Sequence, residues 1–143
     1  MSIFIVIQFI RPTRNTSDLV LPTDITKAIN IPGKVLYVFK SACYDCHSNN
    51  TRYPWYVNIQ PIGWIMAKHV KTGKENLNFS EFANYSKRKQ ANKVRSIANS
   101  IKEGSMPLSS YTILHKDAKL SKMNKDLIAN WVTQAKDSIE NKN

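Results

Sequence analysis

The feature that most limits what this chain can fold into is a repeat of apolar residues three and four positions apart, the spacing of one face of an α-helix. The repeat is clearest after Ser121, a residue that can cap a helix, where Leu127, Trp131 and Ala135 follow at this spacing. Similar repeats predict helices over about 32–46, 61–73 and 86–103. No strand pattern follows residue 12. The chain is therefore predicted to be all-α, with about four helices joined by long loops.

Length and composition narrow the possibilities further. The chain has 143 residues, which suits one domain with a core of its own. A hydrophobic content of 42% excludes both a polytopic membrane protein and a wholly disordered chain. Long loops in so small a helical protein also indicate that something other than helix–helix contact fills part of the core.

The charge balance is strongly basic, with 21 Lys and Arg against 10 Asp and Glu and a formal net charge of +11. Such a balance suits nucleic acid, an anionic membrane surface or an acidic protein partner. The basic residues are dispersed, and their densest group is Lys87-Arg88-Lys89. A solvated helix face is the simplest interpretation, and composition alone does not choose a partner.

Residues 1–10 form an apolar run that is interrupted only by Gln8 and ended by Arg11-Pro12. A membrane-spanning helix needs about 20 apolar residues, and the run lacks the basic start and cleavage site of a signal peptide. Residues 1–12 are therefore either a short buried segment, such as a strand, or the end of an N-terminal membrane anchor. Residues 13–31 are mostly polar and contain turn-forming residues, which predicts a linker with a short helical turn beginning at Asp24. Residues 32–143 form the main domain.

Both cysteines of the chain lie in one short motif, Cys43-Tyr44-Asp45-Cys46-His47. The pattern C-x-x-C-H is the attachment signature of c-type haem. On the last turn of a helix, two thiols at this spacing reach the two vinyl groups on one porphyrin edge, and the adjacent imidazole reaches the iron. Cys43 and Cys46 are therefore candidates for thioether attachment, and His47 is the candidate proximal ligand.

Two other interpretations of the cysteine pair have less support. A thioredoxin-like redox pair would need a surrounding βαβ pattern, which the sequence lacks. A zinc site would need further ligands, for which only His69 and His115 remain, without a second C-x-x-C. The directly adjacent histidine favours a c-type haem.

A c-type haem usually has a second axial ligand, and Met106 in Gly104-Ser105-Met106-Pro107 is the best candidate. Its thioether is a soft ligand that favours ferrous iron and raises the reduction potential. One alternative is that Met106 fills a gap in the core. Another is that His69 is the distal ligand, although His69 also suits a contact to a haem propionate or a structural position.

Aromatic residues crowd the irregular stretches of the chain, where polar residues are usual. A flat apolar cofactor would account for this, because aromatic rings pack against a porphyrin. Arg52 and Trp55 are further candidates for hydrogen bonds to haem propionates. The aromatic residues concerned are Tyr53, Trp55, Tyr56, Trp64, Phe79, Phe82 and Tyr111.

These residues together resemble the haem-binding domain family of c-type cytochromes, the type found chiefly in Bacteroidetes. The resemblance extends from about Ile7 to Val132. It rests on residues 42–49, 51–56, Pro61, Trp64, His69-Val70, Gly73, 77–80, Met106-Pro107, Tyr111, His115, Ala118 and Leu120-Ser121. Leu108 and Lys74 depart from it, since a second Pro and an Arg are common at these positions.

The resemblance implies a cytochrome-c-like helical domain wrapped around one covalent haem c, attached through Cys43 and Cys46 and ligated by His47 and Met106. It also implies export across the inner membrane and tethering there through the N-terminus. We therefore expect a periplasmic carrier of single electrons, not an enzyme, whose lysines attract acidic redox partners rather than nucleic acid. The alternatives are a haem-based sensor or peroxidase-like enzyme with a labile distal position, and a haem-storage or structural module. No His/Arg acid–base pair near Met106 supports a peroxidase.

Overall fold

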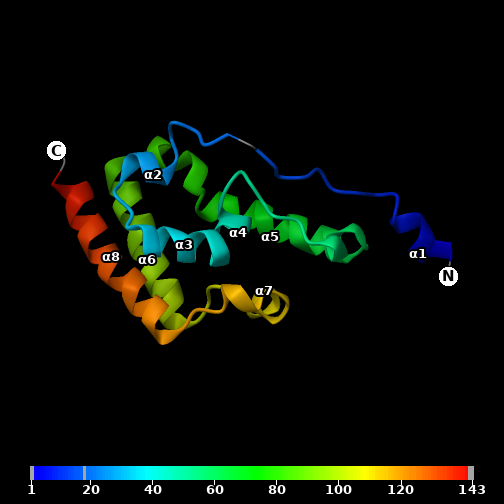
Figure 1. Cartoon of the computed structure of the whole chain (residues 1–143). Coiled ribbons are helices and arrows are strands. Elements are labelled where there is room, and N and C mark those ends of the chain that lie inside the picture. Colours follow the sequence, from blue (N-terminus) through cyan, green and yellow to red (C-terminus); the bar gives the residue numbers. More distant parts are fainter. Residues whose placement is uncertain (1, 18, 142–143) are drawn as a thin grey trace.

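Helices α6 (Lys87–Glu103) and α8 (Lys122–Glu140) pack along each other and carry much of the core. A computed structural model describes residues 2–17 and 19–141, and all regular structure in these ranges is helical (Figure 1). The hydroxyls of Ser86 and Ser121 cap the two helices by accepting N–H bonds from Lys89 and Asn124. Gly104 ends α6 with a φ of 73°, a conformation that glycine adopts without strain. The all-α prediction is confirmed.

The helix predicted over 32–46 is two helices, α3 (Gly33–Ala42) and α4 (Tyr44–His47). Cys43 separates them with non-helical backbone angles, φ −126° and ψ −38°. Its N–H still donates to the Phe39 carbonyl, so the chain turns without losing that bond. Val35, Val38 and Phe39 of α3 are buried in the core, and α4 leaves it to lie against α5.

Helix α5 (Ile62–Asn76) continues past Gly73, where the sequence predicts its end. Gly73 does not have a positive φ, so it does not end the helix. A side chain on Gly73 would instead collide with α4, because a Cβ built there lies 2.4 Å from the Cys46 carbonyl oxygen. The glycine is needed for the close approach of two helices rather than for a C-terminal cap.

Short elements occupy the stretches predicted as loops. They are α2 (Ile25–Ala28), η1 (Trp55–Asn58), η2 (Phe79–Asn84), α7 (Ser109–Leu114) and η3 (Lys116–Ala118). The predicted turn after Asp24 is confirmed as α2, capped by the Asp24 carboxylate. Ile25 and Ile29 are buried in the core, so the second half of the 13–31 segment packs as part of the domain rather than as a free linker.

The core has two parts. The larger lies among α3, η2, α6 and α8, where Phe39 packs against both Phe79 and Trp131. The smaller consists of Val57, Met66 and Val70, beside partly buried tyrosines 53, 56 and 111. The smaller cluster lies between η1 and α5, next to α7.

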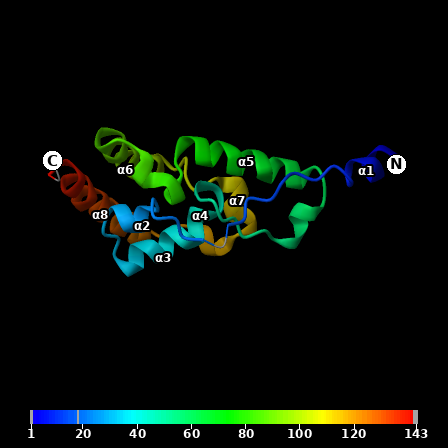
Figure 2. The same ribbon diagram turned by 90° about the horizontal axis from the view of Figure 1, so that it is seen from above.

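The N-terminal run is a short helix, α1 (Ser2–Ile7), at the end of the molecule opposite the C-terminal end of α8 (Figure 2). None of its residues is buried, so the alternative of a short buried strand is wrong. The hydrogen bonds that join this end of the chain to the domain come just after α1: Gln8 forms two with Gln60, and the Ile10 carbonyl accepts one from Trp64 Nε1. Within residues 2–17 and 19–141, no helix has the length and apolar character needed to cross a membrane.

Candidate functional site

The cysteine motif occupies one turn at the end of α4. Cys43 stands at the boundary between α3 and α4, and Cys46 and His47 follow on the turn itself. Both thiols are free and half-buried. Burial raises the pKa of Cys43 to about 12 and that of Cys46 to about 11. The two sulfurs are therefore protonated at neutral pH, and they lie within one helical turn, as the motif predicts.

His47 is oriented by a backbone carbonyl. Its Nδ1 lies 3.0 Å from the carbonyl oxygen of Leu77, the residue that ends α5. A carbonyl only accepts, so Nδ1 carries the hydrogen and the lone pair is on Nε2. Burial lowers the pKa of His47, which favours the neutral ring. A neutral imidazole whose other nitrogen is bonded to a backbone carbonyl is the usual form of a metal-binding histidine.

Aromatic packing fixes the ring further. Phe79 lies edge-on to His47, with 6.2 Å between ring centroids. Phe79 itself is stacked between Phe39 and Tyr44, at 5.4 and 5.0 Å. The predicted site residue Phe79 thus lies beside His47, as part of the main core.

The contact of α4 with α5 at Gly73 brings the motif close to the end of α5, where Leu77 follows the helix as its C-cap. The Cβ of an alanine at position 73 would lie 2.4 Å from the oxygen and 3.2 Å from the Cβ of Cys46. Any larger side chain would therefore push the Cys46 turn away from α5. Gly73 and Leu77 act together. The absence of a side chain at Gly73 lets α4 approach α5 closely, and this approach brings His47 Nδ1 within hydrogen-bonding distance of the Leu77 carbonyl.

A buried carboxylate inside the motif joins it to two other segments. Asp45 is 4% exposed, and its Oδ2 accepts a hydrogen bond from the Tyr111 hydroxyl at 2.6 Å. Its Oδ1 accepts from the backbone N–H and from Nε of Arg52, at 3.1 and 3.2 Å. The Thr51 hydroxyl donates to the Asp45 carbonyl oxygen at 2.6 Å. Sequence reasoning missed the role of Asp45, although its place between two cysteines was visible.

Met106 lies on the loop between α6 and α7, where its backbone N–H donates to the Ser100 carbonyl at 3.2 Å. Its side chain is 37% exposed, so it is not a buried gap-filler of the main core. His69 lies on α5, half-buried, one position before the buried Val70. At 100° per residue, His69 is at the edge of the helix face that Met66, Val70 and Gly73 bury.

Four other predicted site residues make contacts away from the thiols and the imidazole. Arg52 pairs with Asp45. The Tyr53 hydroxyl accepts from the Asn15 backbone N–H at 2.8 Å. Trp64 donates from Nε1 to the Ile10 carbonyl at 2.8 Å, and Trp55 is 75% exposed on η1. These contacts are to other residues of the protein. For Arg52 and Trp55, the sequence had predicted hydrogen bonds to haem propionates.

A second cluster was not predicted. His115 packs against Tyr111 with 4.2 Å between ring centroids, and its Nε2 lies 3.1 Å from the Tyr56 hydroxyl. Its Nδ1 is buried without a hydrogen-bond partner among the described residues. The contact between Tyr111 and His115 could have been predicted from their i, i+4 spacing, because residues four apart on a helix are neighbours.

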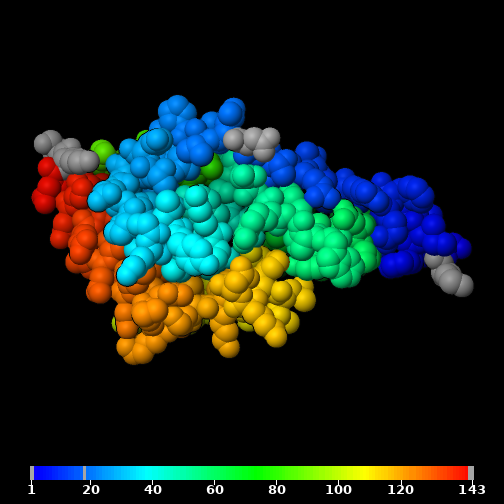
Figure 3. Space-filling view, in the orientation of Figure 1, coloured from blue at the N-terminus to red at the C-terminus, as the bar shows by residue number. Residues whose placement is uncertain are grey.

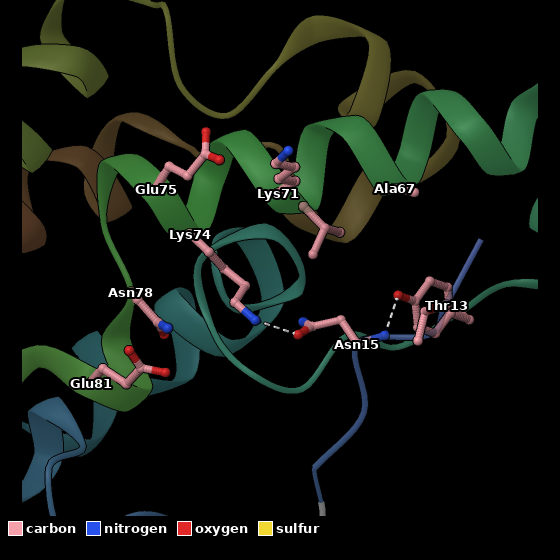
Figure 4. A pocket seen from close by; sticks show the side chains of 10 residues that line it. Thr13, Asn15, Ala67, Lys71, Lys74, Glu75, Asn78 and Glu81 are labelled. Carbon is pink, nitrogen blue, oxygen red and sulfur yellow. Dashed lines mark hydrogen bonds between the residues drawn. The ribbon is translucent and has the colours of Figure 1, made fainter.

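A cavity of about 400 Å³ lies between α5 and the N-terminal segment (Figure 4). Lys74 donates from Nζ to the Asn15 side-chain oxygen at 2.7 Å across one side of it. The Asn15 amide donates to Ser48 and Thr51, in the loop that follows His47. The start of the predicted linker is thus bonded to the segment beside the motif.

The residues of the motif suit a covalently bound haem. Two thiols on one turn, a neutral imidazole with a free Nε2, and a close helix crossing are the donor set and the frame that such a group needs. In the part of the chain that the structure describes, no three His, Cys, Asp or Glu side chains converge as a metal-binding group.

Comparison with known proteins places the chain in a family. The family model described as "Haem-binding domain" matches residues 2–134, nearly the whole chain. Neither a curated protein nor a solved structure matches. The match covers the cysteine motif, the Leu77 carbonyl, the Met106 loop and the Tyr111–His115 cluster. This chain therefore belongs to the haem-binding domain family.

Proposed function

We propose that the protein is a monohaem c-type cytochrome that carries single electrons and catalyses no reaction of its own. The observation that carries this proposal is the hydrogen bond from His47 Nδ1 to the Leu77 carbonyl, beside two thiols on the same turn. It leaves Nε2 as the only ring nitrogen able to bind iron. When bound, the haem would supply an iron that gains and loses one electron.

The chain's own residues would hold that iron in a constant environment. Cys43 and Cys46 would attach the haem through thioethers, and His47 would be the proximal ligand. A ring fixed by Leu77 and by Phe79 changes orientation little between oxidation states. Small rearrangement suits outer-sphere electron transfer, because no bond has to be made or broken.

Met106 is our proposed distal ligand, and two contacts support it. Its loop begins at Gly104 and is held by N–H bonds of Ser105 and Met106 to the Ser100 carbonyl. The helix that follows, α7, is bonded to the motif through Tyr111 and Asp45. The Met106 loop is thus connected at its far end to the turn that carries the proximal ligand.

We further propose that the protein works in the periplasm, tethered to the inner membrane at its N-terminal end. The exposed apolar side chains of α1 support this. For partners, we propose acidic redox proteins that meet the exposed first turn of α6, where Lys87, Arg88 and Lys89 lie. Charge attraction of this kind accelerates association without binding the partner tightly.

The haem assignment is tested on the purified protein by a pyridine haemochrome spectrum and by extraction with acidified acetone. We expect the spectrum of a haem with two thioether bonds and a pigment that stays with the protein. His47→Ala should abolish the low-spin spectrum. An extractable pigment would overturn covalent attachment, and a normal low-spin spectrum in His47→Ala would overturn the proximal assignment.

The distal ligand is tested by comparing Met106→Ala with His69→Ala. Met106→Ala should retain covalent haem, bind carbon monoxide readily when reduced and have a lower reduction potential, because a soft ligand is lost. His69→Ala should show none of these changes. If the two results are exchanged, the axial pair is His47 and His69.

The partner proposal is tested by the salt dependence of electron transfer to an acidic acceptor protein. The rate of association should fall steeply up to physiological salt, where the Debye length is about 8 Å. A duplex DNA titration in the same buffer is the control, because nucleic-acid binding is also salt-sensitive. A salt-independent transfer rate together with tight DNA binding would contradict the proposed partner class.

A further inference from the structure

One end of the folded domain has an exposed apolar surface, which we call the apolar tip. It is formed by η1, the turn after it and the first turn of α5. Trp55 is 75% exposed and Ile65 is 52% exposed. Its members are Trp55, Ile59, Ile62, Trp64 and Ile65.

The apolar tip is continuous with the N-terminal helix. Trp64 donates from Nε1 to the Ile10 carbonyl at 2.8 Å. Gln8 and Gln60 form two hydrogen bonds with each other, at 2.9 and 3.2 Å. The residues of the tip and the N-terminal segment lie beside each other at one end of the molecule (Figures 1 and 3). The exposed apolar residues of 3–10 therefore extend this surface beyond the domain.

The two stretches of chain that form this end carry charges of a single sign. Residues 1–17 and 46–74 contain no Asp or Glu, so all 10 carboxylates of the chain lie outside these two stretches. Arg11, Arg14 and Lys68 are exposed in the same two stretches. Arg14 is held there by a bond to the Asn58 side-chain oxygen at 2.7 Å. An apolar surface with cations and no carboxylates complements a layer of apolar chains covered by anionic headgroups.

We propose that the apolar tip is a membrane-docking surface that inserts into the headgroup region of an anionic lipid bilayer. Trp and Ile side chains would enter the interface, where indole rings are favoured. The cations would lie at the level of the lipid phosphates, where each Lys or Arg increases binding about fivefold. This contact belongs to the folded domain and is additional to the tether proposed for the N-terminal end. Docking by both would orient α5 toward the membrane and leave α6 and α8 directed away from it.

The surface is tested by flotation of the intact haem-loaded protein with vesicles of phosphatidylglycerol and phosphatidylcholine. Trp55→Ser and Ile65→Ser should each reduce the partition coefficient roughly five- to tenfold, because each removes a partly exposed apolar side chain. Tyr37→Ser is the matched control, since Tyr37 is also 75% exposed but lies on α3. It should partition as the unmodified protein does. Far-ultraviolet circular dichroism of all three variants should be unchanged, and so should the haem spectra of Ile65→Ser and Tyr37→Ser.

Three results would overturn the proposal. The first is that Trp55→Ser and Ile65→Ser partition as well as Tyr37→Ser does, which would assign all membrane binding to α1. The second is equal binding to vesicles of phosphatidylcholine alone, which would remove the role of the cations. The third is a dimer in sedimentation that Trp55→Ser dissociates, which would make the tip a contact between two copies of the chain. None of these three results depends on the axial ligands, so the docking surface and the haem assignment are tested independently of each other.

Discussion

Replacing Tyr111 by Phe removes one oxygen atom and tests whether the buried Asp45 joins α7 to the cysteine motif. The Tyr111 hydroxyl donates to Asp45 Oδ2 at 2.6 Å, and Asp45 is 4% exposed. A hydrogen bond to a charged group contributes about 1.5–3 kcal/mol to stability. Asp45 retains three hydrogen bonds from Arg52, two to Oδ1 and one to Oδ2, so we expect the lower part of that range, about 1.5–2 kcal/mol.

In a domain of this size such a loss corresponds to a fall in melting temperature of roughly 5–7 °C. Thermal unfolding followed by circular dichroism measures it, with Tyr37→Phe as the control, because Tyr37 is exposed. A double-mutant cycle with Asp45→Ala isolates the pair, and its coupling energy should be about 1.5 kcal/mol. The reasoning is refuted if Tyr111→Phe has the same effect with and without Asp45, or melts like Tyr37→Phe.

Two further predictions concern packing and ionisation. Gly73→Ala should destabilise the protein by about 1–3 kcal/mol in thermal melts, because its Cβ would lie 2.4 Å from the Cys46 carbonyl oxygen. Gly33→Ala, where nothing lies within 4 Å, should change stability by less than about 0.5 kcal/mol; equal melting of the two variants would contradict the helix-crossing argument. In alkali, burial raises the pKa of Tyr44 and Tyr111 above the ordinary value of 10.0. Their contribution to stability is therefore complete below the unfolded pKa and is lost as the pH rises above it. Tyrosinate absorbance should develop at higher pH in the folded protein than in the urea-unfolded chain, and superimposed titration curves would exclude the shift.

The sequence alone predicted the helical class, the main helices and the haem-binding family. Helix-forming repeats and capping residues act within a few positions of each other, so α6, α8 and their serine caps follow from local patterns. The same locality places Cys43, Cys46 and His47 within one turn, because the three residues are at most four positions apart. The secondary structure of residues 1–12 could not be predicted, because so short an apolar run fits a strand as well as a helix.

The tertiary structure decided which atoms meet across long stretches of sequence. The Leu77 carbonyl that orients His47 is 30 residues away, and Tyr111 is 66 residues from Asp45. Such pairs depend on how helices cross, and the crossing of α4 and α5 depends on the absence of a side chain at Gly73. Periodicity does not contain this information, because it states which face of a helix is apolar but not which helix covers it. For the same reason Arg52, Trp55 and Trp64 were recognisable as notable residues, while their partners were decided only when distant segments packed together.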